Sequence, residues 1–466
     1  MKSIGIDIGT TTVSIVAVDL EINTVVDSRT IKNDSFIPSA HAWERVQDVG
    51  KILSCAVTAL EDFLQKYSDI AAIGLSGQMH GIVYTDDRGR AVSPLYTWQD
   101  KRADLEDEDF DGRSICAVLE EDCGIHAAPG YGMATHLYFV KKGLVPEEAV
   151  SFCTIADYVG MALTGRSRPL VHISQAASLG LYDHEAKAFR MDILAKMGAD
   201  LSLIPQVTDE LSVLGTYRGA GTEIRITAGS GAGTEIPVFV SIGDNQASFL
   251  GAVRDPENSV LVNVGTGSQI SVQSDHYYDG KGIEARPLSK DSYLLVGSAI
   301  CGGASFAYLE KFFRTYAAAA GAPDVPQYDV MKKLLEEHAE ASAEQAAKYA
   351  ADDFWKVRTT FAGTREDPDE TGSMTGITTA NFHPAALIGG VLDGMAEELY
   401  DMYRIMEEEA GISRSVLVGS GNGIRMNRAL QDILSRKFEM PLEVEKNEEE
   451  AAFGAAVNAA ISQSGR

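Results

Sequence analysis

The sequence predicts an α/β protein built from two related domains. With 466 residues, the chain is too long for one compact core. Strand-turn-strand segments of similar composition occur at residues 4–19 and 260–272, and Gly265 lies 256 positions after Gly9. Elsewhere, short apolar runs typical of strands are interspersed with segments that have helical spacing. We therefore expect one domain over residues 1–254 and a second over residues 255–466.

The first segment carries one acid, Asp7, followed by a turn of glycine and threonines. Gly9 allows the backbone to approach a ligand closely, and the hydroxyl and N–H groups of Thr10 and Thr11 form a concave set of donors suited to phosphate oxygens. Asp7 would repel a phosphate unless a divalent cation lay between them, which favours Mg²⁺ held through water. Either segment alone could be an ordinary hairpin. Two of them would hold a polyphosphate from two sides.

Composition excludes several classes of partner. The chain has 67 acidic residues against 40 Lys and Arg, a formal charge of -27, which would repel nucleic acid and anionic membranes. Its five cysteines contain no CxxC pair, which fits reduced thiols. Asp7 interrupts any signal-peptide core, and no later segment approaches about 20 uninterrupted apolar residues. We expect a cytoplasmic protein, and a homodimer is compatible with the sequence.

Two segments of the first half mix polar groups with aromatic ones. An amphipathic helix within residues 43–67 precedes a strand at 71–75, whose carboxyl end delivers Gln78, Met79 and His80. Gln78 and His80 could bind hydroxyl groups, although a structural hydrogen bond also explains His80. Farther along, Trp98 stands beside Asp100 in a run that suits a sugar ring and its hydroxyls. The alternative is a core tryptophan next to solvated charges.

Asp244 follows a predicted strand at residues 237–242 and should begin a helix. Such an aspartate can be a simple N-cap. It also lies just before the second strand-turn-strand segment, which makes it our candidate for the base that orients and deprotonates an attacking hydroxyl.

Glycine-rich segments recur in the second half at residues 297–303 and 419–423, the latter after a strand at 416–418. A glycine floor under adenine or ribose explains the 419–423 segment, and so would a dinucleotide fingerprint, although the full GxGxxG spacing is missing. The apolar stripe of a helix at residues 384–408, which includes Met395, is interpreted as core.

Taken in order, these motifs resemble the FGGY carbohydrate kinases, relatives of the actin-like ATPases, and the similarity spans nearly the whole chain. The resemblance implies two actin-like (ribonuclease H-like) domains with a central cleft, sugar bound mainly by the first domain and nucleotide by the second. It implies that Asp244 is the catalytic base, and that Asp7 and Asp244 hold Mg²⁺. The implied ATP contacts are Gly9, Thr10, Thr11, Gly265, Thr266, Gly267, Gly302, Gly303, Gly419, Ser420, Gly421, Asn422 and Asn427. The implied sugar contacts are Gln78, Met79, His80, Trp98, Asp100 and Asp244.

Within this family the sequence is most similar to the sedoheptulokinases and next to the xylulokinases. Lys101 departs from the glycine usual in sedoheptulokinases, so a charged side chain borders the expected sugar site. We therefore expect ATP-dependent phosphorylation of a terminal ketose hydroxyl, with sedoheptulose first and xylulose or another sugar as the alternative. The rival from another class is an actin-like or chaperone-like ATPase switch without a sugar substrate. A weaker rival is a dinucleotide oxidoreductase that uses Gly419–Gly423.

Overall fold

The computed structural model describes residues 1–218, 235–342, 353–365, 367–447 and 449–464. The chain divides into two compact units. Unit 1 comprises Met1–Gly251, Arg286–Ser292 and Glu449–Arg466, and unit 2 comprises Ala252–Ala285 and Tyr293–Glu448. The C-terminal segment thus lies with the N-terminal unit rather than with the residues that precede it.

Unit 1 is built on a seven-stranded sheet with the order β13-β14-β5-β1-β2-β3, in which β15 also pairs with β5. The strands β1, β2 and β3 are antiparallel neighbours, whereas β5 runs parallel to β1, and β14 and β15 run parallel to β5. The elements of the sheet are β1 (Lys2–Ile8), β2 (Thr12–Asp19), β3 (Thr24–Lys32), β5 (Ile70–Gly77), β13 (Val213–Thr216), β14 (Pro237–Phe239) and β15 (Ile242–Gly243).

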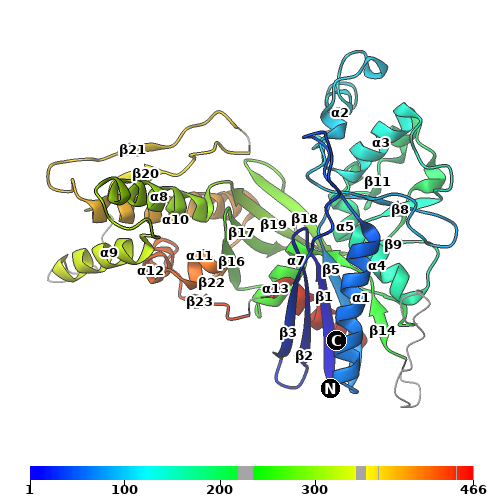
Figure 1. Ribbon diagram of the computed structural model, residues 1–466, viewed down its shortest axis with the longest axis horizontal. Coiled ribbons are helices and arrows are strands. Elements are labelled where there is room, and N and C mark those ends of the chain that lie inside the picture. The colour runs from blue at the N-terminus through cyan, green and yellow to red at the C-terminus, as the bar shows by residue number, and fades with distance from the viewer. Residues whose placement is uncertain (219–234, 343–352, 366, 448, 465–466) are drawn as a thin grey trace. The chain divides into compact units, whose positions relative to one another are not determined.

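Helices cover the sheet, and α13 comes from the far end of the sequence. Figure 1 shows this red C-terminal helix beside the blue N-terminal strands. Gly5 and Gly74, which are paired in β1 and β5, make the close approach possible: a Cβ on either would come within 2 Å of a helix carbonyl, at 1.8 Å from Ala452 O and 1.9 Å from Ala455 O. The helices that pack on the sheet are α1 (Val49–Lys66), α4 (Ile155–Thr164) and α13 (Glu450–Ser464).

Several helix ends follow from local chemistry. The helix expected within residues 43–67 begins at Val49 because the side chain of Asp48 caps it by accepting from Lys51 N. Thr154 and Asp157 form a reciprocal capping box at the start of α4. α4 ends at Gly165 with φ 71°, a left-handed conformation that favours glycine.

The rest of unit 1 includes a short strand before α1, short elements inserted after β5, and the helix that follows β15. Its small sheets pair β4 with β7, β6 with β8, β9 with β12 and β10 with β11. The elements are β4 (Val46–Gln47), β6 (Val83–Thr85), β7 (Leu95–Tyr96), α2 (Ile115–Cys123), α3 (Gly132–Lys142), β8 (Ser151–Cys153), β9 (Leu170–His172), α5 (Ile173–Ser178), β10 (Tyr182–Asp183), β11 (Ala188–Phe189), α6 (Met191–Lys196), β12 (Gln206–Thr208) and α7 (Asp244–Ala252).

Unit 2 repeats the sheet pattern of unit 1. Its order is β18-β19-β17-β16-β22-β23, with β19, β17 and β16 antiparallel and β16, β22 and β23 parallel. The hairpin β16-β17 therefore corresponds to β1-β2, and β22 corresponds to β5. The strands are β16 (Ser259–Val264), β17 (Ser268–Ser274), β18 (Ile283–Ser289), β19 (Ser292–Ala299), β22 (Val416–Ser420) and β23 (Leu442–Val444).

A long helix, α10, organises the remainder of unit 2. It begins at Pro384, a residue whose fixed φ suits the first helical position. It packs against α8, α9 and α12, and Met395 and Leu399 contribute to its buried stripe, as the sequence pattern predicts. The elements are α8 (Gly302–Ala319), α9 (Tyr328–Ser342), β20 (Lys356–Arg358), β21 (Ser373–Thr375), α10 (Pro384–Ala410), α11 (Asn422–Arg425) and α12 (Arg428–Lys437).

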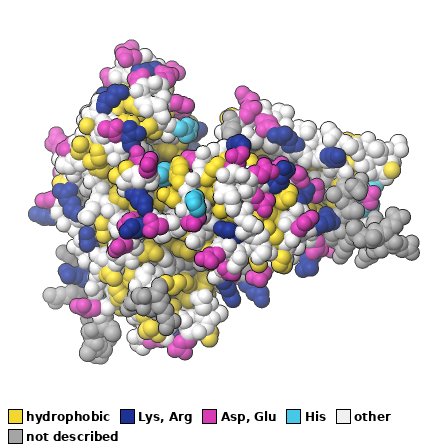
Figure 2. Space-filling model, turned by 180° about the vertical axis from the view of Figure 1, so that it is seen from behind, with side chains coloured by type: hydrophobic (Ala, Val, Ile, Leu, Met, Phe, Trp, Pro, Cys, Tyr) yellow, Lys and Arg dark blue, Asp and Glu magenta, His cyan; other side chains and the backbone are white. Residues whose placement is uncertain are grey.

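Figure 2 shows acidic and basic side chains interspersed over one face, without a continuous basic surface on the part that is described. The five cysteines are all unpaired. Within the described ranges, no helix has both the length and the apolar character needed to cross a bilayer.

Candidate active site

The backbone carbonyl groups of the turn between β1 and β2 accept hydrogen bonds from neighbouring segments. Asn33 Nδ2 donates to Gly9 O (2.8 Å), Gln47 Nε2 donates to Thr10 O (2.9 Å), and Asn33 N donates to Thr11 O (2.8 Å). Among the described residues, no hydrogen bond uses the N–H of Thr10 or Thr11 as its donor. These N–H groups suit an anion such as a phosphate oxygen.

The Thr10 hydroxyl is engaged inside the protein. It accepts from Trp98 Nε1 (3.0 Å) and donates to Gln78 Oε1 (3.2 Å). Its one proton is therefore committed to Gln78, and the backbone N–H groups are the better candidates for phosphate donors in this turn. The same two bonds bring the predicted sugar contacts Gln78 and Trp98 to the predicted phosphate turn.

Asp7 lies at the carboxyl end of β1. Ser76 Oγ donates to Asp7 Oδ1 (2.8 Å), and β5 places Ser76 between Asp7 of β1 and Ile242 of β15. Asp244 follows β15 directly, so the ends of these strands bring Asp7 and Asp244 to one edge of the sheet. The sequence predicts that Asp244 begins a helix, and α7 does begin there.

Both carboxyl groups have raised pKa values. Burial, followed by the nearby charges of Asp244 and Glu449, raises the pKa of Asp7 to about 7, although Ser76 opposes the shift. Burial raises the pKa of Asp244 to about 6, while the backbone N–H of Asn245 and the charge of Arg286 oppose the shift. Two neighbouring acids of this kind are stabilised in their ionised form by a cation.

A polar cluster from α4, β9 and α5 holds the backbone that precedes Asp244. Ser241 Oγ donates to Asp157 Oδ1 (2.6 Å), Gln175 Nε2 donates to Ile242 O (3.1 Å), and Gly243 N donates to Ser174 Oγ (3.2 Å). All of these side chains are buried. Three successive residues before the candidate base are thus anchored.

His172 completes this cluster. Ser174 N donates to His172 Nδ1 (3.3 Å), so Nδ1 is an acceptor; it also accepts from Ser174 Oγ (2.8 Å), and the ring proton is assigned to Nε2. Burial lowers the pKa of His172 to about 4, so the ring is neutral at pH 7. Ser241 carried no local signal, because its partner Asp157 lies 84 positions away in the chain.

His80 and Met79 lie at the same edge of the sheet. His80 has φ 73°, and its Nδ1 lies 2.6 Å from Ser178 O, a pure acceptor. Nδ1 therefore carries the proton, which makes Nε2 an acceptor for a hydroxyl group. The ring stacks on Tyr131 at 4.9 Å. Met79 packs against Gly243, where a Cβ would meet its sulfur at 2.7 Å.

Asp100 has a different environment from the other predicted sugar contacts. It is fully buried; Oδ1 accepts from Arg102 N and Nε, and Oδ2 accepts from Arg45 N and Arg102 Nη2. These bonds occupy both oxygens, so the geometry favours a structural role for Asp100, and its contact with a sugar stays a prediction. The neighbouring Lys101 is exposed, and Trp98 is 47% exposed.

In unit 2 the glycine segments pack directly on one another. A Cβ on Gly302 would lie 2.3 Å from the backbone of Gly267, and one on Gly303 would lie 2.3 Å from Gly265 O. Gly421, with φ 82°, packs in the same way on Val264. The predicted phosphate turn and both predicted nucleotide segments therefore meet at the carboxyl ends of β16 and β22.

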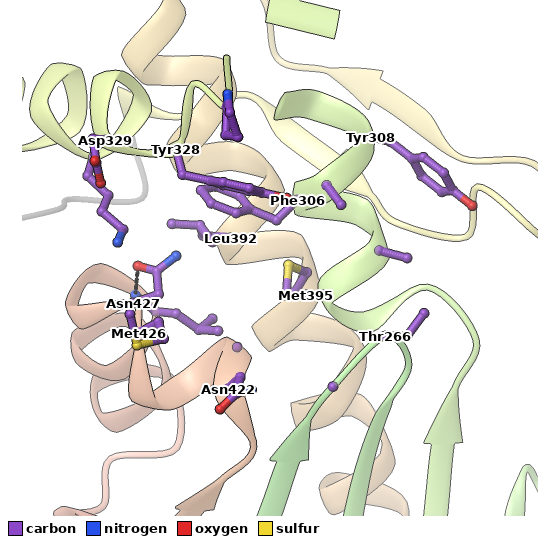
Figure 3. A pocket seen from close by; sticks show the side chains of 18 residues that line it. Thr266, Phe306, Tyr308, Tyr328, Asp329, Leu392, Met395, Asn422, Met426 and Asn427 are labelled. Atoms are coloured by element: carbon purple, nitrogen blue, oxygen red, sulfur yellow. Dashed lines mark hydrogen bonds between the residues drawn. The ribbon is translucent and has the colours of Figure 1, made fainter. Parts of the chain in front are cut away.

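Beside this junction lies a cavity of about 940 Å³, shown in Figure 3. Its size and largely apolar lining suit a nucleoside. Phe306 and Tyr328 stack at 5.8 Å on one side, and Leu392 and Met395 of α10 also contribute. The predicted nucleotide contacts that line it are Gly265, Thr266, Gly303, Asn422 and Asn427.

Two other residues that were predicted to contact the nucleotide, Gly419 and Ser420, do not line the cavity. Ser420 is buried, and its hydroxyl accepts from Asn263 Nδ2 (2.7 Å), so Gly419 and Ser420 shape the floor rather than line the cavity. Asn427 caps α12 by accepting from Leu430 N (3.2 Å), which leaves its amide nitrogen as a donor. Phe306 and Tyr328 were not predicted, because single aromatic residues in helices look like core.

The fold and both sites define an ATP-dependent carbohydrate kinase. The chain belongs to the FGGY family of carbohydrate kinases: the family's N-terminal domain matches residues 3–251 and its C-terminal domain matches residues 260–463. This confirms the family and the two-domain fold expected from the sequence.

Among individual proteins, the chain is 26% identical to sedoheptulokinase of Mus musculus, over 98% of this chain and 96% of that protein. It is also 26% identical to sedoheptulokinase of Homo sapiens, over 98% and 95%. A solved xylulose kinase from Rhodospirillum rubrum superposes with a TM-score of 0.79 at 22% identity, covering 99% of this chain and 90% of that one. A ligand-bound xylulose kinase from Lactobacillus acidophilus gives 0.77 at 19%, covering 100% and 90%.

Proposed function

We propose that this kinase phosphorylates the terminal hydroxyl of a ketose, with sedoheptulose as the preferred substrate and xylulose as the alternative. The two sedoheptulokinases that match nearly the full length of the chain support this choice of sugar. The observation that carries the proposal is the single edge of the unit 1 sheet at which Asp244, Asp7, His80 and Gln78 gather.

In this proposal Asp244 orients the attacking hydroxyl and accepts its proton. With a pKa of about 6, its carboxyl group is largely ionised at pH 7 and can accept a hydrogen bond from the sugar. Phosphoryl transfer passes through a loose transition state, so alignment matters more than base strength. The bonds that anchor residues 241–243 serve that alignment.

Gln78, Met79, His80 and Trp98 are the proposed sugar contacts. His80 Nε2 offers an acceptor, and the exposed indole of Trp98 offers an apolar face. In unit 2, Thr266 and Asn427 contribute to the proposed ATP site, with the base beside Phe306 and Tyr328. Closure of the two domains around the substrates and a cytoplasmic location stay predictions.

Mg²⁺ fits the neighbouring acids Asp7 and Asp244, whose pKa values are raised mainly by burial, because a cation stabilises the ionised form of both. When bound, the ion would neutralise phosphate charge and bring ATP close to these carboxylates. No cluster of three or more His, Cys, Asp or Glu side chains suited to a metal occurs in the described ranges. A site of two acids, completed by water and phosphate, is the usual arrangement for Mg²⁺.

The test is ADP release by the full chain with Mg²⁺ and ATP against sedoheptulose, xylulose, ribulose, fuculose and glycerol, with a reaction lacking sugar as the control. We expect the highest kcat/KM with sedoheptulose. A preference for xylulose would support the alternative sugar. ATP turnover that is the same with and without every sugar would reject the proposal in favour of a nucleotide-driven switch.

A further inference from the structure

We propose that a ring of hydrogen bonds through Thr10, Gln78 and Gln47, joined at Thr10 by Trp98, couples sugar binding to phosphate binding, and that Gln47 is a positioning residue for the phosphate turn. The inference rests on the proposed function in one respect: the sugar covers Trp98, and phosphate binds the N–H groups of the Gly9–Thr11 turn. It adds that the two ligands bind cooperatively through unit 1 itself.

Three bonds close the ring, and Trp98 joins it through a fourth. Trp98 Nε1 donates to Thr10 Oγ1 (3.0 Å), Thr10 Oγ1 donates to Gln78 Oε1 (3.2 Å), Gln78 Nε2 donates to Gln47 Oε1 (2.9 Å), and Gln47 Nε2 donates to Thr10 O (2.9 Å). It begins at the hydroxyl of Thr10 and returns to the carbonyl of the same residue.

The chemistry of the groups fixes the direction of every bond. Thr10 O can only accept, so Gln47 must turn its Nε2 toward this carbonyl and its Oε1 toward Gln78. Gln78 therefore donates from Nε2 and presents Oε1 to the Thr10 hydroxyl, which must donate to it and accept from the indole N–H of Trp98. No bond can reverse alone, so the orientation of the indole and that of the turn are linked.

Burial differs sharply around the ring. Gln47 is 0% and Gln78 is 3% exposed, whereas Trp98 is 47% exposed. A buried amide that loses its partner is costly, so the Gln47 and Gln78 bonds are expected to persist. The Trp98 bond is the weak member, because water reaches the indole and competes for its N–H.

A sugar that covers Trp98 removes this competing water and strengthens the bond to Thr10. The turn is then held in one conformation, with its N–H groups already set for phosphate. Less ordering is left for ATP to induce, so ATP binds more tightly. By linkage, ATP must increase the affinity for sugar by the same factor.

The test measures this factor by calorimetric titration of the full chain with a non-hydrolysable ATP analogue and Mg²⁺, with and without saturating sedoheptulose. We expect sedoheptulose to lower the Kd of the analogue at least about 5-fold. In Trp98→Phe, which keeps an aromatic face but lacks the N–H, the factor should fall to about 1. The factor is a ratio of two nucleotide affinities, so saturating the variant with sugar removes any effect of weaker sugar binding.

Trp355→Phe is the matched control, because it removes an indole N–H bond of similar length, 2.9 Å to Asn381 O, from unit 2. It should keep the parent's factor. Gln47→Met, checked for folding by its thermal unfolding midpoint, should lose the factor as Trp98→Phe does. The inference would be overturned if Trp98→Phe or Gln47→Met kept the parent's factor. It would also be overturned if the parent bound sugar but showed no change in nucleotide affinity. Either result would leave the proposed function intact. Failure of the parent to bind any sugar of the panel would overturn both.

Discussion

Ser241, which lies three residues before Asp244, donates a hydrogen bond of 2.6 Å from its Oγ to the buried carboxyl group of Asp157. Asp157 also accepts from Thr154 at the start of α4. The carboxyl group of Asp157 therefore links the first turn of α4 to the segment that carries the candidate base. Asp157 thus contributes to the start of α4 and, in the proposed function, to the position of Asp244.

The first prediction concerns the pH dependence of stability. Burial raises the pKa of Asp157 from 3.8 to about 6, so the folded protein binds this proton more tightly than the unfolded chain. The stabilisation is complete below pH 3.8 and is lost as pH rises through about 6, a change of about 2 to 3 kcal/mol. Asp157→Asn removes this loss. The unfolding midpoint of the variant should therefore rise relative to the parent between about pH 4 and 7. If the difference between the unfolding midpoints of variant and parent stayed constant over this pH range, the raised pKa of Asp157 would be contradicted.

Asp244→Asn should lower kcat for sugar phosphorylation by about 10²- to 10⁴-fold, because the amide can align the hydroxyl but cannot accept its proton. Binding of ATP, measured by calorimetry, should change far less. Asp62→Asn on the exposed face of α1 is the control and should retain full turnover. Substantial turnover by Asp244→Asn would remove this residue from the proposed role.

Ser174→Ala removes the acceptor for Gly243 N–H and should lower kcat about 10-fold, with little change in the KM for ATP. Ser151→Ala is the matched control, since its hydroxyl is as buried and donates to Leu203 O (3.0 Å) at a distance from the site. Both variants should lose about 1 kcal/mol of stability. If the two lose kcat equally, the polar cluster has no special role in positioning Asp244.

Phe306→Ala should weaken ATP binding about 10-fold, because it removes one ring of the stacked pair at the cavity. Phe312→Ala on the same helix is the control: this ring is 62% exposed and does not line the cavity. Titration with an ATP analogue reads out both variants. Equal affinities would place the base elsewhere in unit 2.

Asp100→Ala distinguishes a structural role from a sugar contact. Loss of the carboxylate leaves Arg102, which also lies 4.4 Å from the Tyr96 ring, buried without its main partner. We expect a destabilisation of about 3 to 5 kcal/mol, seen as a lower unfolding midpoint. A normal midpoint with a much higher KM for sugar would instead establish Asp100 as a sugar contact.

The sequence by itself determined the features that depend on neighbours in the chain. The start of α7 at Asp244 follows from the length of the preceding strand, whereas the helix predicted over residues 43–67 begins only at Val49, after the short strand β4. The repeated hairpins and glycine segments likewise predicted the family and the nucleotide site, because backbone approach to phosphate requires small residues at fixed positions.

Only the tertiary structure decided which side chains remain available to a ligand. It commits the Thr10 hydroxyl to Gln78, pairs Asp100 with Arg102, and turns Phe306 and Tyr328 into the walls of a cavity. The physical reason is that hydrogen-bond partners and burial depend on segments distant in sequence. Local composition can suggest which groups carry chemistry, but it cannot show which of them the fold has already satisfied.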